Sequence, residues 1–340
     1  TPGDQGTYTV TLTVTDDDSA GAVDVVVITA TNVAPSVTLS GAGSVNEGSL
    51  YTLNIGVVSD PGNDTVTQYR VNWGDGSAVE LFTPTQLNLV NRTLTHTYID
   101  GTVARTISVD LVDEDGIHVN AGSKAITVQN VAAVLTGIYT DVTTVGENGS
   151  VTLTGSFTDP GVQDSHSVKI VWGDGSPEEM VTLAPGVFEF IAMHQFLDDN
   201  PTGTTSDAYS ISVRVNDATL DSESISRNIT VINAVPTFGA SLTLSAATLT
   251  EGASITLNGT VNDVGTLDTH LVTVDWGDGS VAEMLSLSPT NAFTGSHLYA
   301  VAGSYDVVTT ATDDDGGLVR DTRSVIIADL PPVITPANLG

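Results

Sequence analysis

The sequence predicts an all-β protein built from tandem antiparallel β-sandwiches in an extended array. Apolar and polar residues alternate with a period of two, as in residues 8–14 and 107–112. Valine, isoleucine and threonine dominate these runs, and turn residues interrupt them about every 8–12 residues. No amphipathic helical stretch is found. Since about seven strands per 100 residues suit a two-layer sandwich, each strand is expected to bury one face.

An internal repeat sets the domain organisation. The string Trp-Gly-Asp-Gly-Ser begins at Trp73, Trp172 and Trp276, roughly 100 residues apart. Three further elements recur in step with it: an upstream glutamate followed by Gly or Asn, a downstream histidine two residues before an aromatic, and an Asp-rich loop. The glutamates are Glu47, Glu147 and Glu251, and the histidines are His96, His194 and His297.

Residues 6–18 match residues 303–315 of the last repeat. We therefore expect residues 1–32 to be the C-terminal strand pair of a truncated preceding repeat. This pair should be poorly ordered or should lean on the next repeat. Three whole repeats follow at 33–130, 131–233 and 234–329, and 330–340 is expected to lead into a further domain. The linkers are short and three of four contain proline, which restricts the arrangement of neighbours.

In the third repeat, the alternation places seven strands. They are expected near residues 240–245, 254–261, 270–276, 282–287, 293–299, 304–312 and 318–328.

The Trp-Gly-Asp-Gly-Ser string has a structural explanation. Tryptophan supplies a large apolar side chain to the sandwich interior. Gly-Asp-Gly reverses the chain, because these residues tolerate the positive φ of tight turns. The alternative is an acidic loop that grips a ligand, but the same string in three tandem units favours a requirement of the fold.

Taken together, the motifs resemble those of the PKD (polycystic kidney disease) domain, an immunoglobulin-like sandwich. The resemblance rests on Trp-Gly-Asp-Gly, then His-x-Tyr, then Gly-x-Tyr-x-Val and an Asp-rich loop. It covers almost the whole chain. The sequence departs from the family in a shortened tryptophan motif and in a longer stretch between Ser77 and His96, which could add a strand or a ligand-binding loop. Cadherin-like and Calx-beta repeats are the alternatives.

The resemblance also implies calcium, because PKD modules of some secreted enzymes bind Ca²⁺ with the linker, the Asp-Pro-Gly loop and the Asp-rich loop. Ca²⁺ prefers six to eight oxygen ligands. The matching residues are Asn32, Asp60, Asp64 and Asp113 in the first repeat; Asn130, Asp159, Asp164 and Asp217 in the second; and Asn233, Asp263, Asp268 and Asp313 in the third. The alternative is that they are solvated turn residues, as in a salt-adapted protein.

The histidines do not indicate catalysis. Their recurrence in every unit suggests a packed or hydrogen-bonded position, and no hydrolase, metalloprotease or phosphate-loop motif occurs. We therefore expect a protein that is not an enzyme.

The amino-acid composition limits the possible binding partners of the chain. The 340 residues include 41 acidic and 9 basic ones, for a net charge of −32, so nucleic acid is excluded as a partner. There is no cysteine, which excludes disulfides and thiolate sites. No apolar run is long enough to cross a membrane, so we expect no membrane insertion.

The sequence thus predicts an internal piece of a bacterial extracellular or cell-surface protein, in which this region is a stalk that projects other domains. Its partners are then the neighbouring repeats of the same chain, with Ca²⁺ stiffening their junctions. The alternatives are an adhesive module that binds a surface glycan or protein, and an accessory region of a secreted hydrolase.

Overall fold

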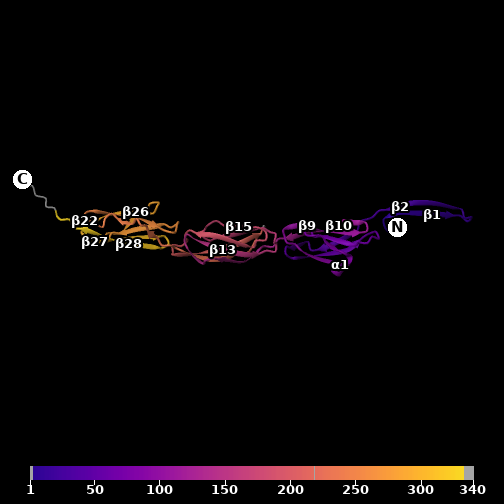
Figure 1. The fold of residues 1–340 in the computed structure, drawn as a ribbon, viewed down its shortest axis with the longest axis horizontal. Coiled ribbons are helices and arrows are strands. Elements are labelled where there is room, and N and C mark those ends of the chain that lie inside the picture. The colour runs from indigo at the N-terminus through magenta and orange to yellow at the C-terminus, as the bar shows by residue number, and fades with distance from the viewer. Residues whose placement is uncertain (1–2, 218, 333–340) are drawn as a thin grey trace, which may run out of the picture.

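The chain forms three β-sandwiches that follow one another in line, with a two-stranded hairpin at one end (Figure 1). The structure, a computed structural model, describes residues 3–217 and 219–332. Among these residues, no helix has the length and apolar character needed to cross a bilayer.

The hairpin consists of β1 (Gly6–Thr15) and β2 (Gly21–Ala30), paired antiparallel. Its apolar face is open to solvent: Val10 is 52% exposed, whereas its counterpart Val307 in the third repeat is 1% exposed. The N-terminal segment of the hairpin contacts the first repeat: Asn63 N–H donates a hydrogen bond to the Gly3 carbonyl at 2.9 Å. The Gln5 side chain also donates to Asp115.

Two sheets make up the first repeat, with strand orders β3-β5-β8 and β4-β10-β9-β6-β7. The strands are β3 (Ser36–Gly41), β4 (Ser44–Asn46), β5 (Leu50–Ser59), β6 (Gln68–Asn72), β7 (Glu80–Phe82), β8 (Thr93–Thr97), β9 (Val103–Asp113) and β10 (Gly116–Gln129).

The second repeat has the same plan, with orders β11-β13-β16 and β12-β19-β17-β14-β15, and β18 pairs with β17. Its strands are β11 (Val134–Thr140), β12 (Thr144–Gly146), β13 (Gly149–Thr158), β14 (His166–Val171), β15 (Glu179–Leu183), β16 (Glu189–Phe196), β17 (Ser206–Asp217), β18 (Leu220–Asp221) and β19 (Ile225–Ile232).

In the third repeat, one sheet has the order β22-β28-β27-β24-β25, and in the other β23 pairs with β20, β21 and β26. Its strands are β20 (Thr237–Phe238), β21 (Thr243–Leu244), β22 (Thr248–Thr250), β23 (Ser254–Asn262), β24 (His270–Asp275), β25 (Glu283–Leu285), β26 (Ala292–Leu298), β27 (Gly303–Asp313) and β28 (Leu318–Ala328).

The long strands of the third repeat lie where the alternation places them. Of the first expected strand, at 240–245, only the two-residue β21 is present, and the short strand β20 lies just before the expected range. The strand β22 was not expected. It pairs parallel with β28, as β4 does with β10 and β12 with β19, so each sandwich is antiparallel apart from this one pair. These strands have only three residues, which is too short for a period-two pattern to reveal.

Each core is organised around the repeated tryptophan. Trp73 is fully buried, and the His96 ring stacks on it with centroids 4.7 Å apart. The outer nitrogen Nε2 of His96 lies 2.6 Å from Asp75 of the Gly-Asp-Gly turn, and Tyr98 donates to the Trp73 carbonyl at 3.1 Å. The histidine is therefore both packed and hydrogen-bonded, as expected. The same arrangement joins Trp172, His194 and Asp174, and Trp276, His297 and Asp278.

The long stretch after Ser77 forms β7 and a short helix, α1 (Pro84–Leu89), which the sequence analysis did not predict. A capping box starts the helix: the Thr83 side chain accepts from Gln86 N–H, and the Gln86 side chain accepts from Thr83 N–H. Leu87 lies in the first core. A helix this short offers too few turns for a 3.6-residue pattern to stand out.

We expect Trp276→Ala to lower the free energy of unfolding of the third repeat by about 3–5 kcal/mol, because it leaves a cavity where a fully buried indole stood. Hydrogen exchange read by mass spectrometry in β23–β28 measures this locally. Val281→Ala, at an exposed side chain of the same repeat, is the control. Unchanged protection of β24 and β27 in Trp276→Ala would contradict the central role of the tryptophan.

Candidate functional site: the acidic junctions

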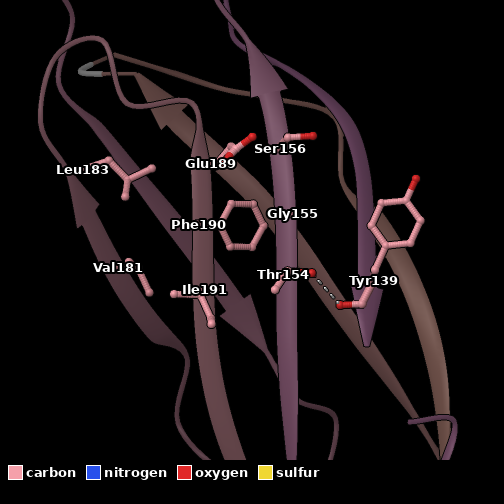
Figure 2. A pocket seen from close by; sticks show the side chains of 9 residues that line it. All are labelled: Tyr139, Thr154, Gly155, Ser156, Val181, Leu183, Glu189, Phe190 and Ile191. Atoms are coloured by element: carbon pink, nitrogen blue, oxygen red, sulfur yellow. Dashed lines mark hydrogen bonds between the residues drawn. The ribbon is translucent and has the colours of Figure 1, made fainter. Parts of the chain in front are cut away.

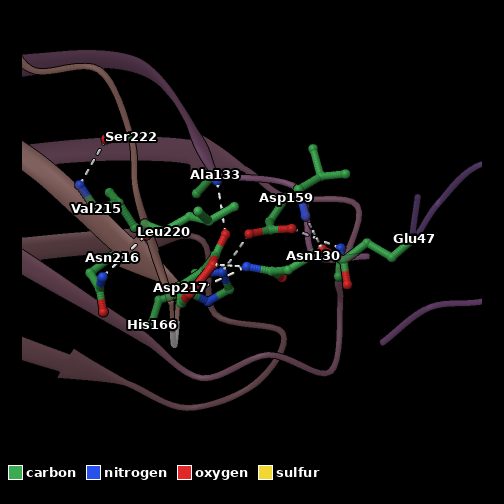
Figure 3. Close-up of polar contacts among 12 residues, drawn as sticks. Glu47, Asn130, Ala133, Asp159, His166, Val215, Asn216, Asp217, Leu220 and Ser222 are labelled. Atoms are coloured by element: carbon green, nitrogen blue, oxygen red, sulfur yellow. Dashed lines mark hydrogen bonds and ion pairs between the residues drawn. The ribbon is translucent and has the colours of Figure 1, made fainter. Parts of the chain in front are cut away.

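Acidic side chains from successive repeats meet at the junctions between them. Each repeat has an exit end, where its last strand passes into the linker, and an entry end, which carries the Asp-Pro-Gly-type loop and the Asp-rich loop. We call the three junctions the first (hairpin to first repeat), the second (first to second repeat) and the third (second to third repeat). Figure 3 shows the second, with Glu47 reaching from the first repeat toward Asp159 and Asp217 of the next.

A buried glutamate marks the exit end. The parallel pairing of β4 with β10 places Glu47 beside the departing chain, where its own N–H donates to the Gln129 carbonyl at 2.9 Å. Its carboxylate accepts from Val131 N–H in the linker at 2.7 Å and from Gly101 N–H at 2.6 Å. The side chain is 1% exposed. One carboxylate thus fixes the path of the linker.

Glu147 repeats this arrangement at the third junction. Its N–H donates to the Ile232 carbonyl at 2.9 Å, and its Oε1 accepts from Ala234 N–H at 2.7 Å. Its Oε2 is buried and has no hydrogen-bond partner within the described residues. This oxygen is therefore available to a ligand.

At the second junction, Glu47, Asp159 and Asp164 each place a carboxylate oxygen within 4.8 Å of the others. Asp159 is also paired with His166 at 2.9 Å. Asp217 takes a structural role beside them: it accepts from the Asn130 side chain, and from Ala133 N–H at 3.1 Å. The four predicted residues of the second repeat therefore gather at one junction.

The two repeats also touch directly here. A methyl group built on Gly48, which has φ +69°, would lie 2.4 Å from Pro160 Cβ of the second repeat. Arg105 pairs with Asp100 across 3.1 Å at the same exit end. The junction is a packed contact with one basic group at its edge.

The third junction is more acidic. Asp268 of the third repeat lies within 4.8 Å of Glu147 and Asp198, both from the second repeat, and it also forms a group with Asp263 and His270. Asp313 accepts from the Asn233 side chain at 3.0 Å. The four predicted residues of the third repeat thus also meet at its entry end.

At the first junction, Asp60, Asp64 and Asp113 form the corresponding group. Asp113 pairs with His118 at 2.7 Å, and Asn32 lines the same small pocket as Asp64.

Burial shifts the acidity of these groups. Desolvation, with the charge of neighbouring carboxylates, raises the pKa of Glu147 to about 7 and the pKa values of Asp64, Asp164 and Asp268 to about 6. Buried carboxylate oxygens with neither a hydrogen-bond nor an ion-pair partner in the described chain occur at Asp60, Asp64, Glu147, Asp164, Asp199 and Asp268. All of them lie at the junctions, which marks these places as ready to receive positive charge.

The acidic residues that the preceding repeat contributes to a junction are not predicted from the sequence. Glu47 and Glu147 carried a usable signal, since they recur in register with the tryptophan motif. Asp198 and Asp199 follow the histidine motif of the second repeat and Asp315 lies in the Asp-rich loop of the third, and only the contact between repeats brings them together.

A surface groove away from the junctions lies along the edge of the second repeat (Figure 2). Tyr139, Phe190 and Ile191 give it an apolar lining, and Glu189 is its one charged residue. Without a converging set of polar groups, this groove resembles an open sandwich edge rather than a built ligand site.

Comparisons with known proteins agree with this fold. Residues 240–327 match the family model of the PKD domain. The chain is similar to the tetra-tandem repeat in the extending region of a large adhesion protein, with 15% identity, a TM-score of 0.50, and coverage of 95% of this chain and 82% of that one. The ectodomain of mouse nectin-like molecule 4 matches at 13% identity and a TM-score of 0.30, over 86% of this chain and 99% of that one. No curated protein matches the sequence.

The chain is therefore a tandem array of PKD-like, immunoglobulin-like sandwiches, as its motifs predict.

We expect the metal-free chain to become more stable as the pH falls from 8 to 5.5. The folded-state pKa values of Glu147, Asp164 and Asp268 are raised above their unfolded values, so their stabilising contribution is present at low pH and is lost as the pH rises through about 6–7. Asp75 and Asp278, whose pKa values are lowered to about 2, do not change in this window.

Thermal unfolding in metal-free buffer measures this slope. The triple variant Glu147→Gln, Asp164→Asn, Asp268→Asn should reduce the slope, because three of the groups that titrate in this window are gone. An equal slope in the variant would assign the pH dependence to other groups.

Proposed function

We propose that this chain is an extracellular spacer whose junctions are stiffened by Ca²⁺. The observation that carries the proposal is the set of buried carboxylates at the junctions that have no hydrogen-bond partner among the described residues, which at the third junction come from both neighbouring repeats. Such groups repel one another, and a cation between them offsets the repulsion while tying the exit end of one repeat to the entry end of the next.

The donor chemistry fits a hard cation. Carboxylate and amide oxygens line the junctions, and Ca²⁺ takes six to eight oxygens in flexible geometry. The chain has no cysteine, and His166 and His270 each already pair with an aspartate, which disfavours zinc. Mg²⁺ demands stricter octahedral geometry and keeps its waters, so it should bind these sites poorly.

The residues that would hold Ca²⁺ come from both neighbouring repeats at the second and third junctions, and from the first repeat alone at the first. They are Asp60, Asp64 and Asp113 at the first; Glu47, Asp159 and Asp164, with Asp217 behind them, at the second; and Glu147, Asp198, Asp263 and Asp268 at the third. Asn233 adds a buried amide oxygen without a partner at the third. The ion supplies only charge and coordination.

The spacer role draws support from the arrangement of the repeats. They lie in line, and the linkers are held by the glutamates at the exit ends (Figure 1). With strands of about 3.3 Å per residue, each sandwich with its loops adds roughly 30–40 Å. One similar solved structure is a tetra-tandem repeat from the extending region of a large adhesion protein, which favours a place outside the cell.

We expect Ca²⁺ to raise the unfolding temperature of the whole chain and to reduce the range of angles between neighbouring repeats. A ligand at about 100 times its Kd adds about 2.7 kcal/mol, which corresponds to about 10 °C or more for a sandwich of this size. Differential scanning calorimetry and small-angle X-ray scattering measure the two effects, with Mg²⁺ at equal ionic strength as the control.

Glu47→Gln and Glu147→Gln should each reduce the response to Ca²⁺ and increase bending at their own junction. Glu251→Gln is the matched control, because Glu251 has the same position in the third repeat but its carboxylate makes no hydrogen bond among the described residues. Equal responses to Ca²⁺ and Mg²⁺ would show general screening of the −32 charge instead, and the proposal would fail.

A further inference from the structure

The third junction contains a second acidic group, two of whose three aspartates have no acidic counterpart at the aligned positions of the second junction. Asp198, Asp199 and Asp315 place carboxylate oxygens within 4.8 Å of one another, and Asp198 also belongs to the group with Glu147 and Asp268. Two sets of ligands therefore share one aspartate. They come from the exit end of the second repeat and the entry end of the third.

The second junction serves as an internal comparison, since the repeats align residue by residue. The position of Asp198 is occupied there by Asp100, but the position of Asp199 is Gly101 and that of Asp315 is Thr219. Both carboxylates that build the second group are thus replaced by residues without charge. The main group, with a glutamate and two aspartates, is present at both junctions.

The carboxylate of Asp199 points to a ligand independently of the clustering. Asp199 is 0% exposed, and neither of its oxygens has a hydrogen-bond partner within the described residues. Asp315, on the Asp-rich loop, is also buried. A buried carboxylate without donors is costly, so it requires either a cation or a proton.

Basic side chains do not supply the charge at this place. At the second junction, Arg105 pairs with Asp100 at 3.1 Å. The residue that aligns with Arg105 in the second repeat is Tyr209, whose hydroxyl donates to the Asp198 carbonyl at 3.2 Å and carries no positive charge. No Lys or Arg forms an ion pair with Asp198, Asp199 or Asp315 among the described residues.

We propose that the third junction binds two divalent cations that share Asp198, one held by Glu147 and Asp268 and the other by Asp199 and Asp315, whereas the second junction binds one. A carboxylate has enough lone pairs to ligate two ions at once, even while Asp198 accepts from Asn200 N–H at 3.2 Å and from its side chain at 2.6 Å. This inference rests on the calcium-binding part of the proposed function and adds a new site and a stoichiometry.

The competing explanation is a proton shared between Asp199 and Asp315. Desolvation and the charge of Asp315 raise the pKa of Asp199 to about 7, so a proton could occupy the pair near neutral pH. The number of ions bound separates the two explanations.

The test counts Ca²⁺ on the whole 340-residue chain by native mass spectrometry and by isothermal titration calorimetry at pH 8. The double variant Asp199→Asn, Asp315→Asn should bind one ion fewer than the wild type. The double variant Glu147→Gln, Asp268→Asn should lose the other. Asp198→Asn should weaken both sites at least tenfold, because they share this residue.

Asp17→Asn, Asp18→Asn removes the same charge at the exposed tip of the β1–β2 hairpin and should keep the full count. The variants remove like charges, so their unfolding temperature without metal should not fall. If the double variant Asp199→Asn, Asp315→Asn misfolds, the number of bound ions is measured instead on the single variant Asp315→Asn, whose substitution lies on the loop.

An unchanged count in Asp199→Asn, Asp315→Asn would overturn the second site and leave the proton-sharing pair. If an ion were then lost only in Glu147→Gln, Asp268→Asn, calcium binding at the junction, and with it the proposed function, would be retained without the second site. A wild type that binds these ions without any change in scattering would instead support the two-ion junction and refute the stiffening role.

Discussion

The parallel pairing of a three-residue strand with the last strand of each sandwich underlies the architecture of the junctions. This pairing carries Glu47 and Glu147 to the point where the chain leaves the sheet, and there each carboxylate binds a linker N–H. Since these side chains also lie within reach of the aspartates of the next repeat, one residue positions the linker and faces the acidic loops. Moving the strand by one residue would turn the glutamate to the other face of the sheet.

The fold could be predicted from the sequence because its signals are local and repeated. Alternation located β23, β24, β27 and β28, and the tryptophan motif defined the period of the array. The short strands β4, β12 and β22 could not be found in this way, because three residues carry no periodicity. The helix α1 was not predicted either, because its 6 residues are too few to show a 3.6-residue period. Its capping box at Thr83 and Gln86 was the local signal available.

Only the part of the candidate site that lies within one repeat could be predicted from the sequence. The loops that carry Asp159, Asp164, Asp263 and Asp268 were identified, because a resemblance maps residues within one repeat. The other half comes from the preceding repeat, and a contact between repeats leaves no pattern in the sequence of either one. Glu47 illustrates this limit: its recurrence marked it as structurally important, but its neighbours Asp159 and Asp164 follow more than 100 residues later.

The same parallel pair has a mechanical consequence. The chain enters each sandwich at one end and leaves at the other (Figure 1). Within the first sandwich, β4 lies beside β10 and runs parallel to it. A force that pulls the two ends of the array apart therefore loads the hydrogen bonds between these strands in shear, so that they must break together rather than one after another. Resistance to tension in this array thus resides in the three-residue strands β4, β12 and β22, next to the residues that join one repeat to the next.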